Sequence, residues 1–207
     1  TDSVTLPTGR SPVLVAPGPS LHDALPWLRR ERERSFLVAV SSALETLRRA
    51  GIEPDLVVHT DGGYWATLHL RSGVERRTPP LAVGIGAALP GRLLETETLL
   101  VADPTSLVEG ALAECAATPV IPIAGHGSVS GTAMRFLANE VEQPAILVGV
   151  DLAVKGFQGH ARPHAFEPLI MAESARHAPL PTLLRRRLRG FQPLRERWGQ
   201  SSDLRTY

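Results

Sequence analysis

The sequence alternates short apolar runs with segments of helical periodicity, and this alternation restricts the fold more than any other feature. The apolar runs are strand-sized and lie at residues 13–16, 36–40, 56–59, 81–85, 99–102, 120–124 and 145–150. Intervening segments such as 21–34 and 129–141 carry apolar residues at helical spacing. Strands that alternate with helices favour a parallel sheet covered on both faces. We therefore predict an α/β fold, a Rossmann-like three-layer sandwich with a mostly parallel sheet.

Single residues predict where some of these elements begin and end. Ser42 can cap a helix, since Glu45 follows three residues later as in a capping box, and Gly51 would end that helix. Residues 64–70 also have helical character. Cys115 is the only cysteine, so an internal disulfide is excluded, and we expect this residue to be a small core side chain.

The regular pattern ends after residue 151, where glycines and prolines break the sequence into loops and short helices. A chain of 207 residues is long enough for one good-sized core. We therefore predict a Rossmann-like nucleotide- or ligand-binding core over residues 1–155. Over residues 156–207 we predict a flap and an arginine-rich helical C-terminal extension that packs on the core.

Charge and hydropathy exclude two classes of protein. Lys and Arg number 22 against 21 Asp and Glu, so the net charge of +1 is too small for a chain that coats nucleic acid. The apolar stretches are strand-sized and fall short of the ~20 residues that a membrane-spanning helix needs. Residues 1–10 lack the pattern of a secretory signal, so we expect cytoplasmic residence.

Arginines crowd one segment near the C-terminus, where Arg185, Arg186, Arg187 and Arg189 have few acidic neighbours in the sequence. Two interpretations stay open. The arginines can form the solvated face of a helix, or they can form a surface for a phosphate, an acidic glycan or an anionic partner.

Polar residues follow the carboxyl ends of most predicted strands. In a parallel sheet those ends share one edge, where a ligand can lie in a crevice and where helix N-termini present unpaired N–H groups to anions. We therefore expect a single cleft that contains Ser20, Ser41, Asp61, Asp103, residues 125–128 and Asp151.

Two glycine-bearing turns in this set are candidate phosphate loops. Gly18, Pro19 and Ser20 form the first turn, and Gly127 and Ser128 belong to the second. In each turn a glycine lets the backbone approach a ligand and a serine can cap the next helix or bind phosphate. Either turn can also be purely structural, since neither has the glycine spacing of a dinucleotide fingerprint or a Walker loop.

Asp61 and two histidines are candidates for acid–base chemistry. Asp61 can act as a base, bind a ribose hydroxyl, hold Mg²⁺ or be a plain turn residue. His160 and His126 are candidate general bases, because the pKa of histidine lies near neutrality. His164 follows His160 by four residues, but Pro163 argues against a regular helix between them, so we do not expect a zinc site.

Several of these motifs occur together in one known superfamily. In order and spacing they resemble the MptE-like 6-hydroxymethylpterin diphosphokinase superfamily, from about Val13 to Ala165. The motifs are residues 15–21 (VAPGPSL), 52–55 (IEPD), Asp61, 127–129 (GSV) and 149–153 (GVDLA). More narrowly, the sequence looks like the bacterial motility accessory factor branch, whose members are implicated in transferring nonulosonic acids to flagellin. The stretch 160–162 (HAR) is similar to that branch.

The resemblance also extends to sialyltransferases that use a CMP-sugar and carry a related Gly-Pro-Ser-Leu turn. It implies that the turn from Gly18 to Ser20 would contact nucleotide phosphate or sugar and that Asp61 would lie near the donor. Gly127 and Ser128 would line the same pocket.

Two positions depart from the family pattern. Pro17 stands where the sialyltransferases carry an asparagine used in the site, and proline offers neither a side-chain amide nor an N–H. Val150 stands where the bacterial branch often has a glutamine.

The resemblance and the residues together favour a glycosyltransferase whose donor is a nucleotide-activated, CMP-linked nonulosonic acid. His160 would be the base, Arg162 would neutralise charge on the leaving group, and flagellin or another protein would be the acceptor. One alternative is an ATP-dependent pyrophosphokinase acting on a pterin-like alcohol, with Asp61 as a ligand of Mg²⁺. A second alternative is a non-catalytic binding domain of the same fold.

Overall fold

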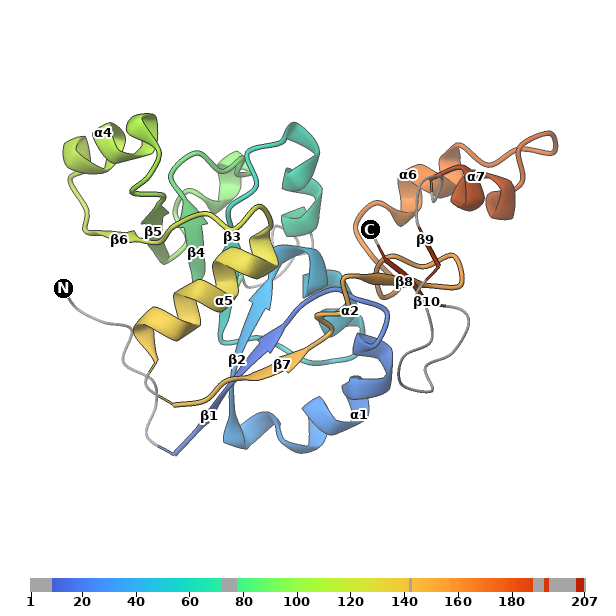
Figure 1. Cartoon of the computed structure of the whole chain (residues 1–207), viewed down its shortest axis with the longest axis horizontal. Coiled ribbons are helices and arrows are strands. Elements are labelled where there is room, and N and C mark those ends of the chain that lie inside the picture. The colour runs from blue at the N-terminus through green and yellow to red at the C-terminus, as the bar shows by residue number, and fades with distance from the viewer. Residues whose placement is uncertain (1–8, 72–77, 142, 188–191, 194–203, 207) are drawn as a thin grey trace.

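The computed structural model describes residues 9–71, 78–141, 143–187, 192–193 and 204–206. Seven parallel strands form its main sheet, in the order β6-β5-β4-β3-β2-β1-β7. The strands are β1 (Ser11–Val15), β2 (Ser35–Val40), β3 (Leu56–His59), β4 (Leu81–Gly84), β5 (Thr98–Ala102), β6 (Val120–Pro122) and β7 (Ile146–Val148). The predicted α/β fold with a parallel sheet is confirmed (Figure 1).

Helices connect the strands. The α-helices of this part are α1 (Leu21–Arg30), α2 (Leu44–Arg49), α4 (Leu107–Cys115) and α5 (Val129–Glu140). The 3₁₀ helices are η1 (Arg32–Arg34), η2 (Ser41–Ala43), η3 (Tyr64–Leu70) and η4 (Gly91–Leu93). Strands β1 to β6 are added in one direction, and α5 then carries the chain back past β3, β2 and β1 to add β7 (Figure 1).

The core lies between the sheet and these helices. Strand β1 is the centre of the larger cluster, where Val13, Leu14 and Val15 are fully buried against Leu21 of α1 and Phe136 of α5. A smaller cluster joins α2, η3 and η4 to strands β3 and β4. Burial of these branched apolar side chains is the main term that stabilises the sandwich.

A C-terminal extension follows β7. It contains α6 (Glu167–Ala172), α7 (Leu180–Arg187) and a small antiparallel sheet of β8 (Ala153–Lys155), β10 (Leu204–Thr206) and β9 (Gln192–Pro193). The helical extension predicted from the sequence is therefore present, although Arg189 lies outside the described residues. Figure 1 shows α6 and α7 beyond one end of the main sheet.

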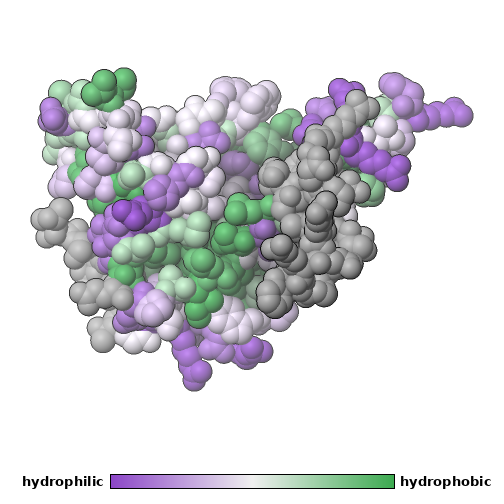
Figure 2. All heavy atoms as spheres, viewed as in Figure 1, coloured by the Kyte–Doolittle hydropathy of each residue, from purple (hydrophilic) through white to green (hydrophobic). Residues whose placement is uncertain are grey.

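Two surfaces of the domain remain apolar (Figure 2). One lies over the edge strand β7, where Ile146 and Leu147 are exposed, and the other over α4, where Leu107 is 92% exposed. Helix α4 has no buried residue. No helix of the described residues is long and apolar enough to cross a membrane.

Two local predictions are wrong. Ser42 does not cap α2, because residues 41–43 form a 3₁₀ turn first and the α-helix begins one turn later, after Ala43. Cys115 is exposed and not a core residue, because it ends α4, which buries none of its side chains. Gly51 does end α2: it adopts φ +71° and donates to the Arg48 carbonyl oxygen.

Candidate functional site

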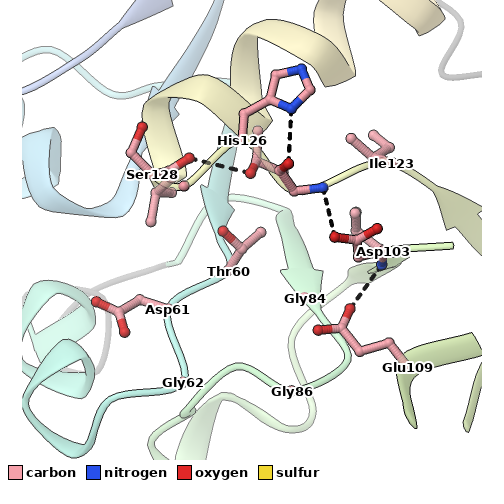
Figure 3. Close-up of a pocket in the computed structure, with 15 residues that line it drawn as sticks. Thr60, Asp61, Gly62, Gly84, Gly86, Asp103, Glu109, Ile123, His126 and Ser128 are labelled. Carbon is pink, nitrogen blue, oxygen red and sulfur yellow. Dashed lines mark hydrogen bonds between the residues drawn. The ribbon is translucent and has the colours of Figure 1, made fainter. Parts of the chain in front are cut away.

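A cavity of about 420 Å³ lies at the carboxyl edge of the sheet, among the turns that follow β3, β4, β5 and β6 (Figure 3). The turn after β3 contributes Asp61, and the turn between β6 and α5 contributes His126, Gly127 and Ser128. The remaining polar lining comes from Thr60, Asp103, Glu109 and Thr132. The parallel strands therefore bring part of the predicted site together.

The N-terminus of α5 forms one wall of this cavity. Ser128 caps the helix, since its Oγ accepts from the Gly131 amide at 3.1 Å and its carbonyl accepts from the Thr132 amide at 3.0 Å. The amides of Val129 and Ser130 donate to no acceptor among the described residues. Gly127 adopts φ +69°, which turns the chain into the helix. The wall thus presents two unpaired N–H groups and the positive end of a helix dipole.

The other predicted phosphate loop is different, because its amides already have acceptors. The Ser20 amide donates to Asp151 Oδ2 at 2.7 Å. The Gly18 amide donates to the Gly149 carbonyl at 2.8 Å, and the Leu21 amide donates to the Gly18 carbonyl at 3.0 Å. At the start of α1, the Asp151 carboxylate therefore takes the position that an anion would occupy.

Carboxylates line the wall that faces α5. Asp61 Oδ1 accepts from the Gly63 amide at 2.8 Å, and Glu109 Oε2 accepts from the Asp103 amide at 2.8 Å. In Figure 3, Asp61 and Glu109 lie below the cavity, whereas Ser128 and His126 lie above it. The His126 ring is directed away from Asp61 in this view, and its Nδ1 lies 2.9 Å from the Gly125 carbonyl oxygen.

Asp103 fixes the loop that leads into α5. Its Oδ1 accepts from the amide and hydroxyl of Thr105, and its Oδ2 accepts from the Gly125 amide at 2.9 Å. These hydrogen bonds from Thr105 and Gly125 hold the pKa of Asp103 below its usual value. Asp103 therefore joins the end of β5 to the loop after β6 and keeps the cavity in shape.

The acids of the cavity do not form a metal site. Within the described ranges, no three His, Cys, Asp or Glu side chains are grouped so that they could hold a metal ion. The donor set around Asp61 consequently does not fit a magnesium ion held between clustered carboxylates.

His59 is a buried polar residue that the sequence interpretation missed. It ends β3 and is fully buried, with Nε2 2.9 Å from the Ala88 carbonyl oxygen and Nδ1 2.9 Å from Ser41 Oγ. Burial lowers the pKa of His59, so the ring is neutral: Nε2–H donates to Ala88 and Nδ1 accepts from the Ser41 hydroxyl. Ser41 is buried in this contact and does not line the cavity.

His160 and Arg162 lie elsewhere, in the segment before α6. They line a second cavity of about 280 Å³ together with Phe166 and Ile170. The segment is held against the core because the Ala161 amide donates to the Pro17 carbonyl at 2.7 Å and the Arg162 amide donates to His22 Nε2 at 2.9 Å.

Three partly buried histidines surround this segment. The rings of His160 and His164 are 5.9 Å apart, and the His69 ring packs edge-to-face on Phe166 at 4.7 Å. Burial, with a smaller contribution from the neighbouring imidazoles, lowers the pKa of His69 and of His164 to about 4. Burial also lowers the pKa of His160. All three rings are therefore neutral at pH 7.

Two arginines of the C-terminal extension have acidic partners. Arg162 forms an ion pair with Glu167, and Arg187 pairs with Glu173 at 3.1 Å. The Arg185 guanidinium lies 5.3 Å from the centre of the Phe157 ring. The acidic partners come from α6 and the residue after it, which the local sequence around the arginines does not reveal.

Comparison with known proteins confirms the family that the sequence motifs indicate. The model of a family described as 6-hydroxymethylpterin diphosphokinase MptE-like matches residues 4–156. The chain belongs to the MptE-like family. The matched residues include the first cavity and the β1–β7 junction, whereas every lining residue of the second cavity lies beyond them.

One relative of this MptE-like chain is an uncharacterized protein of Treponema pallidum (strain Nichols). The two are 36% identical over 130 residues, which are 62% of the chain and 29% of the relative. Among solved structures, the chain is similar to a MAf glycosyltransferase from Magnetospirillum magneticum AMB-1, with a TM-score of 0.57 and 19% identity. That match covers 74% of the chain and 25% of the solved protein, and it shows a shared fold. The chain thus spans less than a third of each of these relatives.

Apart from Ser41, which is buried against His59, the predicted site residues of the MptE-like chain fall into three groups. Asp61, His126, Gly127 and Ser128 share the first cavity. Gly18, Ser20 and Asp151 contact one another at the junction of β1 and β7, with Pro19 in the same turn. His160 and Arg162 line the second cavity. Thr60 and Glu109 also line the first cavity, and the sequence interpretation had not selected them.

Proposed function

We propose that this MptE-like domain belongs to a glycosyltransferase whose donor is a nucleotide-activated nonulosonic acid. CMP is the expected nucleotide, and flagellin or another protein is the expected acceptor. The observation that carries the proposal is the pair of unpaired amides of Val129 and Ser130 at the wall of the 420 Å³ cavity. Such a helix N-terminus stabilises a phosphate group by hydrogen bonds and by its dipole.

The opposite wall supports a nucleotide in preference to a bare phosphate. Asp61 and Glu109 present carboxylate oxygens to the cavity, and carboxylates accept hydrogen bonds from hydroxyl and amino groups. A cytidine monophosphate has one phosphate, two ribose hydroxyls and an exocyclic amine. Its phosphate would bind at α5, and its donor groups would face the acids.

Transfer from such a donor breaks the bond between the anomeric carbon of the sugar and a phosphate oxygen, through an oxocarbenium-like transition state. The electron pair stays on the phosphate, where the α5 amides would stabilise the added charge. The acceptor hydroxyl loses its proton as its oxygen bonds to the anomeric carbon. His160 is our candidate for the base. It lines the second cavity, so it would act on an acceptor that approaches from that side, and burial lowers its pKa and keeps the ring unprotonated at pH 7.

The likeness to a MAf glycosyltransferase supports this proposal at the level of the fold. The description of the matching family favours a second candidate, a diphosphokinase that uses ATP and Mg²⁺ on a pterin-like alcohol. We rank it second because the described acids around Asp61 lack the cluster that would hold the metal.

The proposal is tested by replacing one unpaired amide without unfolding α5. In the Val129→Pro variant, proline stands at the first helical position, which it tolerates, and Ser128 before it is already extended (φ −152°, ψ 153°). We expect CMP affinity, measured by calorimetry on the 207-residue chain, to fall about 10-fold, the loss of one charge-assisted hydrogen bond.

Leu107→Pro is the matched control, because Leu107 is the first residue of α4 and also follows an extended serine cap (φ −86°, ψ 116°). This variant should bind CMP as the wild type does. Selective stabilisation of the wild type by Mg-ATP, with no response to CMP, would instead support the diphosphokinase. Unchanged CMP affinity in Val129→Pro would remove the α5 phosphate site.

A further inference from the structure

Two large aromatic side chains project into solvent just after the Asp61 turn. Tyr64 is 77% exposed and Trp65 is 57% exposed. Their ring centres are 5.2 Å apart with an interplanar angle of 78°, an edge-to-face pair. Such rings gain most free energy when they are covered, so a pair held in solvent at the edge of a cavity indicates a binding surface.

The backbone holds the rings in this position. The first turn of η3 is closed by the Ala66 amide, which donates to the Gly63 carbonyl at 2.9 Å, and by Thr67 Oγ1, which donates to the Tyr64 carbonyl at 2.8 Å. Ala66 and Leu70 anchor the helix in the core. These two residues fix the buried side of η3, and Tyr64 and Trp65 lie on its exposed side.

The pair lies close to the first cavity. Gly62 lines that cavity and Tyr64 follows it by two residues, so their Cα atoms are at most about 7 Å apart.

The same helix also faces the segment of His160. Side chains three residues apart eclipse each other in a 3₁₀ helix, which puts Trp65 in one row with Leu68 and Arg71. Leu68 and Arg71 line a groove of about 630 Å³ together with Arg162 and His164. Trp65 therefore stands at the N-terminal end of a row whose later members line this groove. In Figure 1 the teal segment of η3 rises at this edge of the sheet, between β3 and α6.

We propose that Tyr64 and Trp65 form the platform for the sugar ring of the donor, with the apolar C–H face of a pyranose packed on the Trp65 ring. This inference rests on the proposed function, since it takes the phosphate at α5 as fixed. The anomeric carbon stays bonded to that phosphate until transfer, so the rest of the sugar ring extends out of the cavity, whose lining at Gly62 lies just before η3. The negative π face of an indole complements the slightly positive C–H groups of a sugar ring.

Two other occupants agree less well with the structure. A nucleobase would find the hydrogen-bond acceptors for its amino group inside the cavity, at Asp61 and Glu109, and not beside the exposed rings. A protein partner needs roughly 800 Å² on each side, far more than two side chains supply.

The test compares a nucleotide with and without its sugar. Binding of CMP and of CMP-N-acetylneuraminic acid to the 207-residue chain is measured by calorimetry for the wild type and for Trp65→Ala, Trp65→Phe and Tyr64→Ala. We expect Trp65→Ala to weaken binding of the CMP-sugar about 10-fold and leave CMP unchanged, and Trp65→Phe to retain most of the affinity. Leu107→Ala, at a residue 92% exposed on α4, is the control and should change neither ligand.

Two other results for Trp65→Ala would contradict the proposed sugar platform. Equal weakening of CMP and of the CMP-sugar by Trp65→Ala would mean that the ring stacks on the base. No change for either ligand would mean that the rings do not touch the donor. The proposed function is tested separately by the wild type. If the wild type binds neither CMP nor the CMP-sugar, the proposed function is wrong, and the sugar platform that rests on it is wrong as well.

Discussion

The Asp151 carboxylate accepts a hydrogen bond from the Ser20 amide at 2.7 Å, across 131 positions of sequence. This bond links the turn after β7 to the start of α1, and it occupies the anion position of the first glycine turn. The second glycine turn keeps its amides unpaired. We therefore propose the second glycine turn as the phosphate site, because the Asp151 carboxylate already occupies the first.

The closeness of the two turns makes Gly18 intolerant of any side chain. A Cβ at Gly18 would lie 2.4 Å from Asp151 Oδ2 and 2.4 Å from the Gly149 carbonyl oxygen, both closer than atoms can approach. We expect Gly18→Ala to lower the free energy of unfolding by about 2 to 3 kcal/mol in urea titrations. Gly110→Ala is the control, since nothing lies within 4 Å of its Cβ position, and it should raise stability by about 1 kcal/mol. Equal stability of the two variants would contradict the described junction.

The helix caps allow stability and ligand binding to be separated. Ser106 and Ser128 cap α4 and α5 by the same type of bond, and the amides of Glu109 and Gly131 are the donors. Replacing either serine by alanine should cost about 1 kcal/mol of stability. Only Ser128→Ala should also lower the affinity for CMP, several-fold, as measured by calorimetry. A matching loss of CMP affinity in Ser106→Ala would show that the effect is general and not a property of the α5 wall.

The buried histidines predict a dependence of stability on pH. His69 and His164 have pKa values lowered to about 4, against an ordinary value of 6.5. Between pH 4 and 6.5 the unfolded chain binds more protons than the folded chain, so stability is present above pH 6.5 and is lost as the pH falls toward 4. At about 1.4 kcal/mol per pKa unit, each ring contributes on the order of 3 kcal/mol.

Urea unfolding at pH 7 and at pH 4.5 measures this loss. The double variant His69→Gln, His164→Gln should show a smaller difference between the two pH values than the wild type. His177→Gln, at an exposed residue, should behave as the wild type. If the double variant keeps the full pH dependence of stability, that dependence arises from other titratable groups.

His160→Gln tests the proposed base. We expect the rate of sugar transfer to fall at least 100-fold while binding of the CMP-sugar changes little, because the base acts on the acceptor proton. His126→Gln is the comparison, since the ring of His126 is directed away from the acids of the cavity. If His160→Gln keeps full activity and His126→Gln loses it, His126 and not His160 is the general base.

The sequence predicted most of the fold because strand and helix signals were local. Residues 56–59 were predicted as a strand and residues 64–70 as helical, and the structure has β3 and η3 at those positions. Helix α4 was missed because no side chain of that helix is buried, so the helix lacks the one-sided apolar pattern that marks a packed helix. The Ser42 cap failed because residues 41–43 first form the η2 turn, in which the Ser41 hydroxyl bonds to His59.

Less of the candidate site than of the fold could be predicted from the sequence. The parallel sheet accounts for the shared position of Asp61 and Ser128, since both follow the carboxyl ends of strands. Which amides remain unpaired depends on the tertiary position of Asp151. The burial of Ser41 depends on His59, a polar residue inside an otherwise apolar strand, and that single exception was the signal that could have revealed the pair.

The strand order also determines when the domain can be completed during translation. Strand β1 is translated before every other strand of the main sheet, yet its neighbour on one side, β7, consists of residues 146–148. A nascent chain therefore carries β1 with a bare hydrogen-bonding edge until most of the domain has been synthesised. Contacts of such long sequence separation form slowly, so docking of β7 is expected to be a late event and an exposed stage at which chaperones can act.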